Sequence, residues 1–234
     1  MLEPLKGFFR GSRGGDATGG SAASSGGGRL PVKTRGGGAE PTLSTRPSRG
    51  LEEFFSQIRD TSGLTLLDLG GATQKNVTFI TDLGHRLYSE DFLRILKESF
   101  GSEDSVDQSN PGRIEYFLKQ ALDYPGGHFD GVLVWDVLEY LNPVLLNAVV
   151  ERLHHIVRPK AYLLAFFHSD DKLEAVPSYA FRIAQVNLLE VLQHGSRRPA
   201  QLYNNRSLEK LFGKFESVKF FLTRDRLREI IVKS

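Results

Sequence analysis

An acidic residue followed by two glycines stands at the end of an apolar run, in the segment Leu64–Gln74 with the sequence LTLLDLGGATQ. The carboxylate of Asp68 can accept hydrogen bonds from an amine or an amide. Gly70 and Gly71 let the backbone approach a ligand closely, because they carry no Cβ atom. A buried parallel strand that turns into a helix beneath a nucleotide has this pattern. A plain tight turn between a strand and a helix, without a ligand, is the alternative interpretation.

Two further acids, Glu90 and Asp91, follow 22 and 23 residues after Asp68. They end the short alternating segment HRLYS, His85–Ser89, which is predicted to be a strand. A carboxylate at this place can bind both hydroxyls of a ribose, because it offers two acceptor oxygens. Acids also favour the N-terminus of a helix, so the alternative is that they cap the helix predicted over Phe92–Phe100. The sequence leaves open which of the two acids would bind a ribose.

A third group of functional side chains follows the apolar run FDGVLVW, where the sequence predicts a strand over Gly131–Trp135. Trp135 can pack on a bound ligand, and Asp136 can orient a hydroxyl or an amine. Glu139 and Tyr140 come within one helical turn of Asp136 and are candidates for a general base. The alternatives are that Trp135 belongs to the core and that Glu139 lies on the solvated face of a helix.

The elements that must position these groups follow from apolar periodicity. The residues Leu51, Phe54, Phe55 and Ile58 predict a one-faced helix that covers the first strand. Thr73 is the expected cap of a helix through Leu83, with Val77, Ile80 and Leu83 facing inward. Further helices are predicted over Arg113–Leu122, Pro143–Val157 and a segment that begins at Asn205 or Ser207 and ends at Phe212. Further strands are predicted over Ala161–Phe167, as a pair within 178–203, and as a hairpin whose two strands flank Asp225.

This order of elements predicts an α/β fold, a three-layer sandwich with a mostly parallel twisted sheet that ends in an antiparallel hairpin. Together with the motifs after the strands, it resembles the class I S-adenosylmethionine-dependent methyltransferases, which have a Rossmann-like fold. The resemblance covers about residues 62–234. The glycine turn departs from the family pattern x-G-x-G-x-G, because Ala72 and Gln74 replace its second and third glycines.

The resemblance implies S-adenosyl-L-methionine as the cofactor and methylation as the reaction. The methionine part would lie against the turn after the first strand, the ribose against the acids after the second, and the acceptor beside the segment after Trp135. The implied cofactor-binding residues are Asp68, Gly70, Gly71, Ala72, Glu90, Asp91 and Trp135, and the candidates for catalysis are Asp136, Glu139 and Tyr140.

The expected function is therefore a methyltransferase that moves the sulfonium methyl group to an O, N or C nucleophile, with a small-molecule or macromolecular acceptor that the sequence does not name. The alternative is a catalytically inactive methyltransferase-like binding or scaffold module. The eroded glycine turn favours that alternative, and so does the weak third strand, for which Ser105–Gln108 is the one candidate. Asp107, which would contact the adenine, is a poor match. A nicotinamide dehydrogenase is disfavoured because no G-x-G-x-x-G follows the first strand.

Composition divides the chain near residue 50. Thirteen of the 24 glycines fall in the first fifty residues, and this composition predicts a disordered Gly/Ser/Arg-rich tail over 1–50 and a methyltransferase-like domain over 51–234. The tail carries a net charge of +5 and the rest a net charge of −3. Nucleic acid is therefore an unlikely partner of the domain, whereas the basic tail remains a candidate to contact it.

The sequence contains no cysteine, which excludes disulfides and thiolate sites. No metal site is expected, because His154 and His155 diverge on their helix. No apolar run reaches the roughly 20 residues of a membrane helix, so a soluble, cytoplasmic protein is expected, and its oligomeric state is undetermined.

The segment with Arg197, Arg198, Tyr203 and Arg206 is either a surface loop or a cover over an anionic substrate.

Overall fold

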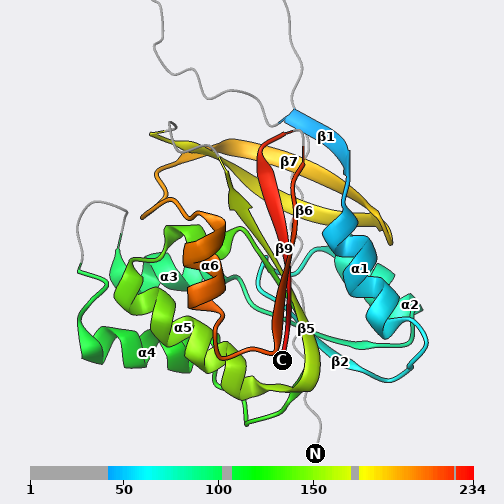
Figure 1. The fold of residues 1–234 in the computed structure, drawn as a ribbon, viewed down its shortest axis with the longest axis horizontal. Coiled ribbons are helices and arrows are strands. Elements are labelled where there is room, and N and C mark those ends of the chain that lie inside the picture. Colours follow the sequence, from blue (N-terminus) through cyan, green and yellow to red (C-terminus); the bar gives the residue numbers. More distant parts are fainter. Residues whose placement is uncertain (1–41, 102–106, 170–173, 224) are drawn as a thin grey trace, which may run out of the picture. The chain divides into compact units, whose positions relative to one another are not determined.

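The computed structural model describes residues 42–101, 107–169, 174–223 and 225–234. A six-stranded sheet with the order β3-β2-β4-β5-β9-β8 forms its centre (Figure 1). The strands β2, β3, β4 and β5 run parallel, and β9 pairs antiparallel with both β5 and β8. The predicted α/β architecture with an antiparallel closing hairpin is confirmed. The bounds are β2 (Thr65–Asp68), β3 (Arg86–Ser89), β4 (Phe129–Trp135), β5 (Val157–His168), β8 (Ser217–Phe221) and β9 (Leu227–Lys233).

The central strands are apolar on both faces, because each face is covered by other elements. Along β5, Leu163, Ala165 and Phe167 belong to one hydrophobic core, whereas Leu164 and Phe166 belong to the other. This alternation is the two-residue period of a strand that separates two cores. The sheet therefore forms the middle layer of a sandwich, as the sequence predicts.

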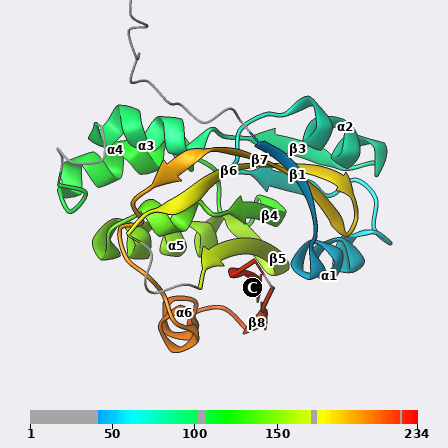
Figure 2. The same ribbon diagram turned by 90° about the horizontal axis from the view of Figure 1, so that it is seen from above.

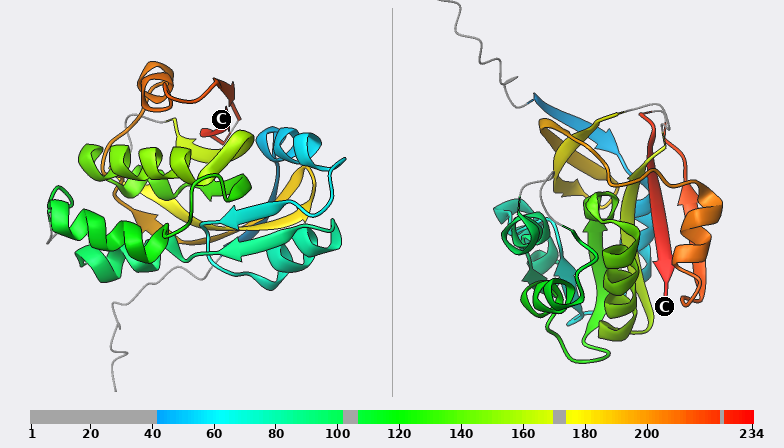
Figure 3. Two further views of the ribbon diagram at one scale, coloured as in Figure 1. Left: turned by 90° about the horizontal axis from the view of Figure 1, so that it is seen from below. Right: turned by 90° about the vertical axis from the view of Figure 1, so that its left-hand side faces the viewer.

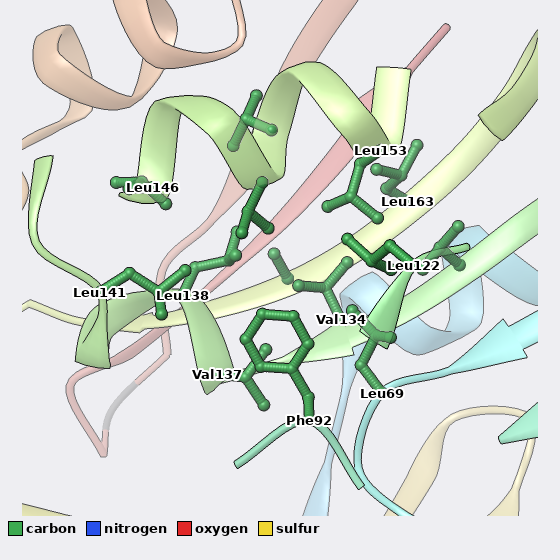
Figure 4. Packing of buried hydrophobic residues seen from close by; sticks show 14 of the residues in the cluster. Leu69, Phe92, Leu122, Val134, Val137, Leu138, Leu141, Leu146, Leu153 and Leu163 are labelled. Carbon is green, nitrogen blue, oxygen red and sulfur yellow. The ribbon is translucent and has the colours of Figure 1, made fainter. Parts of the chain in front are cut away.

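Four helices cover one face of the sheet, and Figure 3 shows α3, α4 and α5 on the side opposite to α1 and α2. Each of the four begins at a side-chain cap, such as Asn142, whose Oδ1 accepts a hydrogen bond from the Leu145 amide at 2.9 Å. Figure 4 shows Leu153 of α5 beside Leu163 of the sheet, and Leu146 of the same helix belongs to the same hydrophobic core. The four helices are α3 (Phe92–Phe100), α4 (Pro111–Ala121), α5 (Pro143–Ile156) and α6 (Asn205–Leu211).

The other face is covered by α1 (Arg49–Ile58) and α2 (Gln74–Asp82). The predicted inward residues of α1 are all buried. For α2 the prediction is partly wrong, because Asn76 and Ile80 are buried whereas Val77 is half-buried and Leu83 is exposed. Asn76 can be buried because its side-chain amide is satisfied by buried hydrogen-bond partners. Thr73 caps this helix as predicted.

A second sheet has the order β1-β7-β6 and lies across the carboxyl end of β5 (Figures 1 and 2). Its strands are β1 (Thr42–Pro47), β6 (Val176–Gln185) and β7 (Leu188–Arg197), all antiparallel. The strand pair predicted within 178–203 is confirmed. Its third strand, β1, lies in the segment that the sequence assigned to the tail. The strand β1 and the start of α1 thus precede the predicted boundary at residue 51, and residues 1–41 lie outside the described residues.

A buried carboxylate fixes β1 and the start of α1 to the central sheet. Glu229 of β9 is fully buried, and it binds Arg46 at 2.9 Å, the Ser48 hydroxyl at 3.1 Å and the Gly50 amide at 2.6 Å. A Cβ atom on Gly50 would lie 2.8 Å from the Leu164 side chain, so glycine is required for this close approach. These long-range contacts explain why a short, exposed strand belongs to the fold.

Two further predictions about the elements need correction. Asn204 caps α6 by accepting from the Ser207 amide at 2.8 Å, in place of Asn205 or Ser207. The candidate third strand, Ser105–Gln108, lies partly outside the described residues, and its described part is not a strand. Asp107 there is exposed, and its Oδ1 accepts a hydrogen bond from the Ser109 amide.

Candidate functional site

Asp68 ends β2 with a carboxylate that is fully buried. It accepts hydrogen bonds from Trp135 Nε1 at 2.6 Å, from Gly70 N at 2.8 Å and from Asn76 Nδ2 at 3.0 Å. Burial raises the pKa of Asp68, although the three donors favour its charged form and lower it. The carboxylate that the sequence assigned to a ligand amine is therefore already bound by groups of the chain itself.

Trp135 lies over the glycine turn. A Cβ atom on Gly70 would be 2.7 Å from Trp135 Cδ1, closer than real Cβ contacts. The indole also stacks on Phe181 of β6, with ring centroids 5.2 Å apart and an interplanar angle of 9°. The absence of a side chain at Gly70 thus makes room for the indole, which occupies the space where a ligand would approach the turn.

The backbone of Trp135 is in the left-handed region, with φ of 58°. A non-glycine residue pays about 1–3 kcal/mol for such a conformation, which persists only where the surroundings enforce it. Here the indole hydrogen bond to Asp68 and the stacking on Phe181 enforce it. The strain lies at the carboxyl end of β4, where ligands of open α/β sheets bind.

Asn76 is a site residue that the sequence analysis missed. Its Nδ2 donates to Asp68 and to the Phe181 carbonyl at 3.3 Å, and its Oδ1 accepts from the Ile183 amide at 2.8 Å. One amide side chain therefore joins the end of β2 to the edge of β6. Asn76 lies three residues after the cap Thr73, on a helix whose polar and apolar residues do not separate into clear faces. The sequence pattern therefore did not indicate that Asn76 would be buried at the site.

A cavity of about 220 Å³ opens at the carboxyl ends of β2 and β4, beneath the β6–β7 strands. The structure brings four predicted residues to its wall, namely Gly70, Asp91, Trp135 and Asp136. The wall that β6 and β7 contribute includes Ser178, Tyr179, Phe181, His194 and Arg197. Ligand pockets usually measure about 300–1,000 Å³, so this cavity is smaller than a typical ligand pocket.

Asp136 follows Trp135 and precedes the 3-10 helix η1 (Val137–Tyr140). Burial, and secondarily the charge of Glu139, raises the pKa of Asp136 to about 7. The Tyr140 hydroxyl donates a hydrogen bond of 3.5 Å to Asp136 Oδ2, and the Arg197 guanidinium lies 5.5 Å from the centre of the Tyr140 ring. Asp136 can therefore exchange a proton near neutral pH while it faces the cavity.

Glu139 does not line the cavity. It is fully buried, and its two carboxylate oxygens accept from the His168 amide and from His168 Nδ1, the latter at 2.7 Å. Tyr140 is also behind the wall, with its hydroxyl directed at Asp136. Of the three candidates for catalysis, Asp136 therefore lies at the cavity, whereas Glu139 and Tyr140, the two candidates for a base, lie behind its wall.

Of the two acids after β3, one lines the cavity and the other does not. The carboxylate of Glu90 accepts a hydrogen bond of 2.5 Å from the Tyr124 hydroxyl and does not line the cavity. Asp91 caps α3 by accepting from the Arg94 amide at 3.0 Å, and it also contributes to the cavity wall. Both readings of the acid pair, a helix cap and a site residue, therefore apply to Asp91. Ala72 is exposed and lies off the cavity wall.

Within the described ranges, no cluster of three His, Asp or Glu side chains could hold a metal ion. No helix in the same ranges is long and apolar enough to cross a membrane. His154 packs edge-on against Phe215, with ring centroids 4.9 Å apart, so it serves packing on α5.

No protein-family model matches the sequence, and no curated protein matches it. Several solved structures are similar to this chain. One is the 1,6-didemethyltoxoflavin-N1-methyltransferase of Burkholderia thailandensis, with S-adenosylhomocysteine bound. It is 13% identical to this chain, and the match has a TM-score of 0.44 and covers 79% of this chain and 76% of that chain. A SAM-dependent methyltransferase of Archaeoglobus fulgidus is 15% identical, with a TM-score of 0.47 over 79% of this chain and 91% of that chain. An S-adenosylmethionine-dependent methyltransferase of Mesorhizobium loti is 13% identical, with a TM-score of 0.45 over 78% and 96%.

Proposed function

We propose that this chain is a methyltransferase-like module that binds a small ligand in the cavity beneath β6 and β7 and does not hold S-adenosylmethionine on the turn after β2. The observation that carries this proposal is the position of Trp135, whose indole lies over Gly70 and donates to Asp68. This is the alternative that the eroded glycine turn already favours.

The residues present do not fit S-adenosylmethionine. Its methionine part needs a free acceptor at Asp68 and open backbone at Gly70, and both are taken by the indole. Its ribose would need a carboxylate at the end of β3, where Glu90 is bound by Tyr124 and Asp91 is engaged in capping α3. The cavity of about 220 Å³ is small for a whole nucleoside with its amino-acid part.

An S-adenosylmethionine-dependent methyltransferase, with an acceptor that stays unnamed, is the second candidate. One observation favours it: Gly70, Asp91, Trp135 and Asp136, which come from three separate segments, line the same cavity. A rotation of the Trp135 side chain away from Asp68 would free the Asp68 carboxylate and enlarge the cavity beside Gly70. This candidate therefore requires the indole to leave its buried position whenever cofactor binds.

Calorimetric titration with S-adenosylhomocysteine separates the two candidates. We expect no heat of binding for the wild type. The proposal is overturned if the wild type binds S-adenosylhomocysteine and the fluorescence of its single tryptophan shifts to the red, as expected for an indole that moves into water. Calorimetry measures binding whether or not the module is catalytically active.

A variant identifies the cause of the exclusion. Trp135→Ala removes the ring, and we expect it to gain binding of S-adenosylhomocysteine that the wild type lacks. Phe167→Leu, a buried change on the opposite face of β5, is the control for general loosening of the core and should bind none. Circular dichroism verifies that both variants are folded before titration.

A further inference from the structure

The strand β3 forms one edge of the six-stranded sheet. Among the strands that the structure describes, it pairs with β2 alone. The amides of Arg86 and Glu90 donate hydrogen bonds of 2.8 Å to carbonyls of the neighbouring β2 segment. Because backbone groups alternate in direction along a strand, the N–H and C=O groups of Leu87 and Ser89 point away from β2. This edge therefore offers donors and acceptors to another strand.

The edge lacks the features by which proteins usually block such pairing, namely lysine, proline and bulges. The segment His85–Asp91 has the sequence HRLYSED, without lysine or proline. Its register with β2 is regular over the whole of β3. The charges of Arg86 and Glu90 have opposite signs, so they do not repel a second copy of the same segment as two lysines would. The edge is thus open to pairing with itself.

One register satisfies all of these groups. In an antiparallel pairing of two β3 strands about a two-fold axis at Tyr88, Leu87 lies opposite the partner's Ser89. Such a pair exchanges both of its backbone hydrogen bonds, as the outward groups of Leu87 and Ser89 require. Tyr88 lies opposite the partner's Tyr88 in a non-hydrogen-bonded pair, whose Cα atoms are about 4.5 Å apart. In the same register Arg86 lies opposite the partner's Glu90 at both ends.

The ring of Tyr88 is held in place for this contact. It packs edge-on against Tyr124, His128 and Phe129, with ring centroids 5.7, 5.2 and 5.6 Å away. The residue nevertheless remains 41% exposed. Aromatic pairs directly opposite each other stabilise antiparallel strands, so a second Tyr88 would cover the exposed part of a ring whose position is already fixed.

The two charges are available for pairing between copies. Arg86 is exposed, and it has no ion pair within the described ranges. The Tyr124 hydroxyl binds one oxygen of Glu90, Oε1, so that Oε2 can accept a second donor. Opposite charges on facing positions of an antiparallel pair stabilise it, and like charges destabilise it.

We propose that β3 is the interface of a homodimer, in which a second copy of this chain extends the sheet by antiparallel pairing about Tyr88. The complementarity of Arg86 and Glu90 favours a second copy over an unrelated strand, because one segment supplies both charges and a two-fold axis uses each of them once per copy. β3 has only four residues, so the dimer is weak and depends on concentration. The inference goes beyond the proposed function and does not depend on the cavity.

Sedimentation velocity of the full chain over about 5–500 µM tests the proposal. We expect the mass to rise from that of a monomer to that of a dimer. Arg86→Glu places like charges opposite each other at both ends and should weaken the dimer by about tenfold or more. Arg206→Glu is the matched control, because Arg206 is an exposed arginine of α6 outside β3 and β2, and it should leave the dimer unchanged. Circular dichroism verifies that the variants are folded.

A mixture of two variants tests the register. Glu90→Arg alone should weaken the dimer as Arg86→Glu does, since it also creates two repulsive pairs. An equimolar mixture of the two variants brings opposite charges together at both ends of a mixed pair. We therefore expect a heterodimer with an affinity close to that of the wild type. A parallel pairing, a shifted register or a different surface gives no such recovery.

Amide hydrogen exchange followed by NMR tests the backbone pairing. Exchange at Leu87 and Ser89 should slow as the concentration of the wild type rises, because the second copy accepts their hydrogen bonds. Exchange at Arg86 should not change, because its amide is already bonded within the sheet.

A wild type that stays monomeric over the whole range would overturn the inference. So would a mixture of Arg86→Glu and Glu90→Arg that stays monomeric, or a loss in Arg206→Glu equal to that in Arg86→Glu. None of these measurements involves S-adenosylhomocysteine or the position of Trp135. A failure of this inference is therefore distinguishable from a failure of the proposed function.

Discussion

Trp135 Nε1 donates a hydrogen bond of 2.6 Å to the carboxylate of Asp68, and this bond joins the ends of the neighbouring strands β2 and β4. The two residues are 67 positions apart in the chain. Each lies at the carboxyl end of a parallel strand, where open α/β sheets bind their ligands, and each satisfies the hydrogen-bonding group of the other. Because of this contact, the carboxyl ends of β2 and β4 are packed against each other. A small cavity remains beside them, beneath β6 and β7.

Removal of the indole donor tests how much this contact stabilises the fold. Trp135→Phe keeps an aromatic ring for stacking on Phe181 but leaves a buried carboxylate with one donor fewer. We expect the free energy of unfolding to fall by about 1.5–3 kcal/mol, measured by urea denaturation with circular dichroism. A loss below about 0.5 kcal/mol would mean that the hydrogen bond contributes little.

The side chain of Asn76 should hold β6 to α2. Asn76→Ala removes three buried hydrogen bonds and leaves the Ile183 amide and the Phe181 carbonyl unsatisfied, so we expect a loss of about 2–4 kcal/mol. Hydrogen exchange at the Ile183 amide should accelerate more than exchange in β4. Thr78→Ala on the exposed face of the same helix is the control and should change stability by less than about 0.5 kcal/mol. Equal exchange rates in β4 and β6 would contradict the assignment.

The ionisation of Asp136 should make stability depend on pH. Its pKa is about 7 in the folded protein, above the ordinary aspartate value of 3.8, so the folded state binds the proton more tightly than the unfolded state. Stability from this group is therefore largest below pH 4 and is lost as the pH rises toward 7 and beyond. Asp136→Asn should be more stable than the wild type at pH 8, by up to about 4 kcal/mol, and the difference should shrink as the pH falls to 4. A difference that is constant between pH 4 and pH 8 would exclude this account.

The anchor at Glu229 should be far stronger than a surface ion pair. Glu229→Gln removes the buried one of the two carboxylates that Arg46 contacts, the other being the half-exposed Asp225. We expect a loss of about 3 kcal/mol, together with faster proteolysis near β1. Glu216→Gln breaks the exposed pair with Lys233 and should cost less than about 1 kcal/mol. The prediction fails if both substitutions have the same effect in thermal unfolding.

Local patterns predicted most of the elements, because burial imposes a period on the sequence. The apolar runs that become β2, β4 and β5, the caps Thr73 and Asp91, and the hairpin around Asp225 all depend on residues close to one another in the chain. The strand β1 could not be predicted in this way. Its residues are mostly exposed, and its partner β7 lies more than 140 residues away in the chain.

The sequence by itself determined an α/β sheet with acidic, glycine and aromatic residues gathered at the carboxyl ends of its strands. It left open whether Asp68, Glu90 and Trp135 face a ligand or one another, because a side chain's partner depends on rotamers and on segments far away in the chain. Tertiary structure alone decided that Trp135 fills the space over Gly70, that Asn76 joins β2 to β6, and that Arg197 reaches the cavity. Each of these contacts forms only after the strands have paired and the second sheet has packed on them.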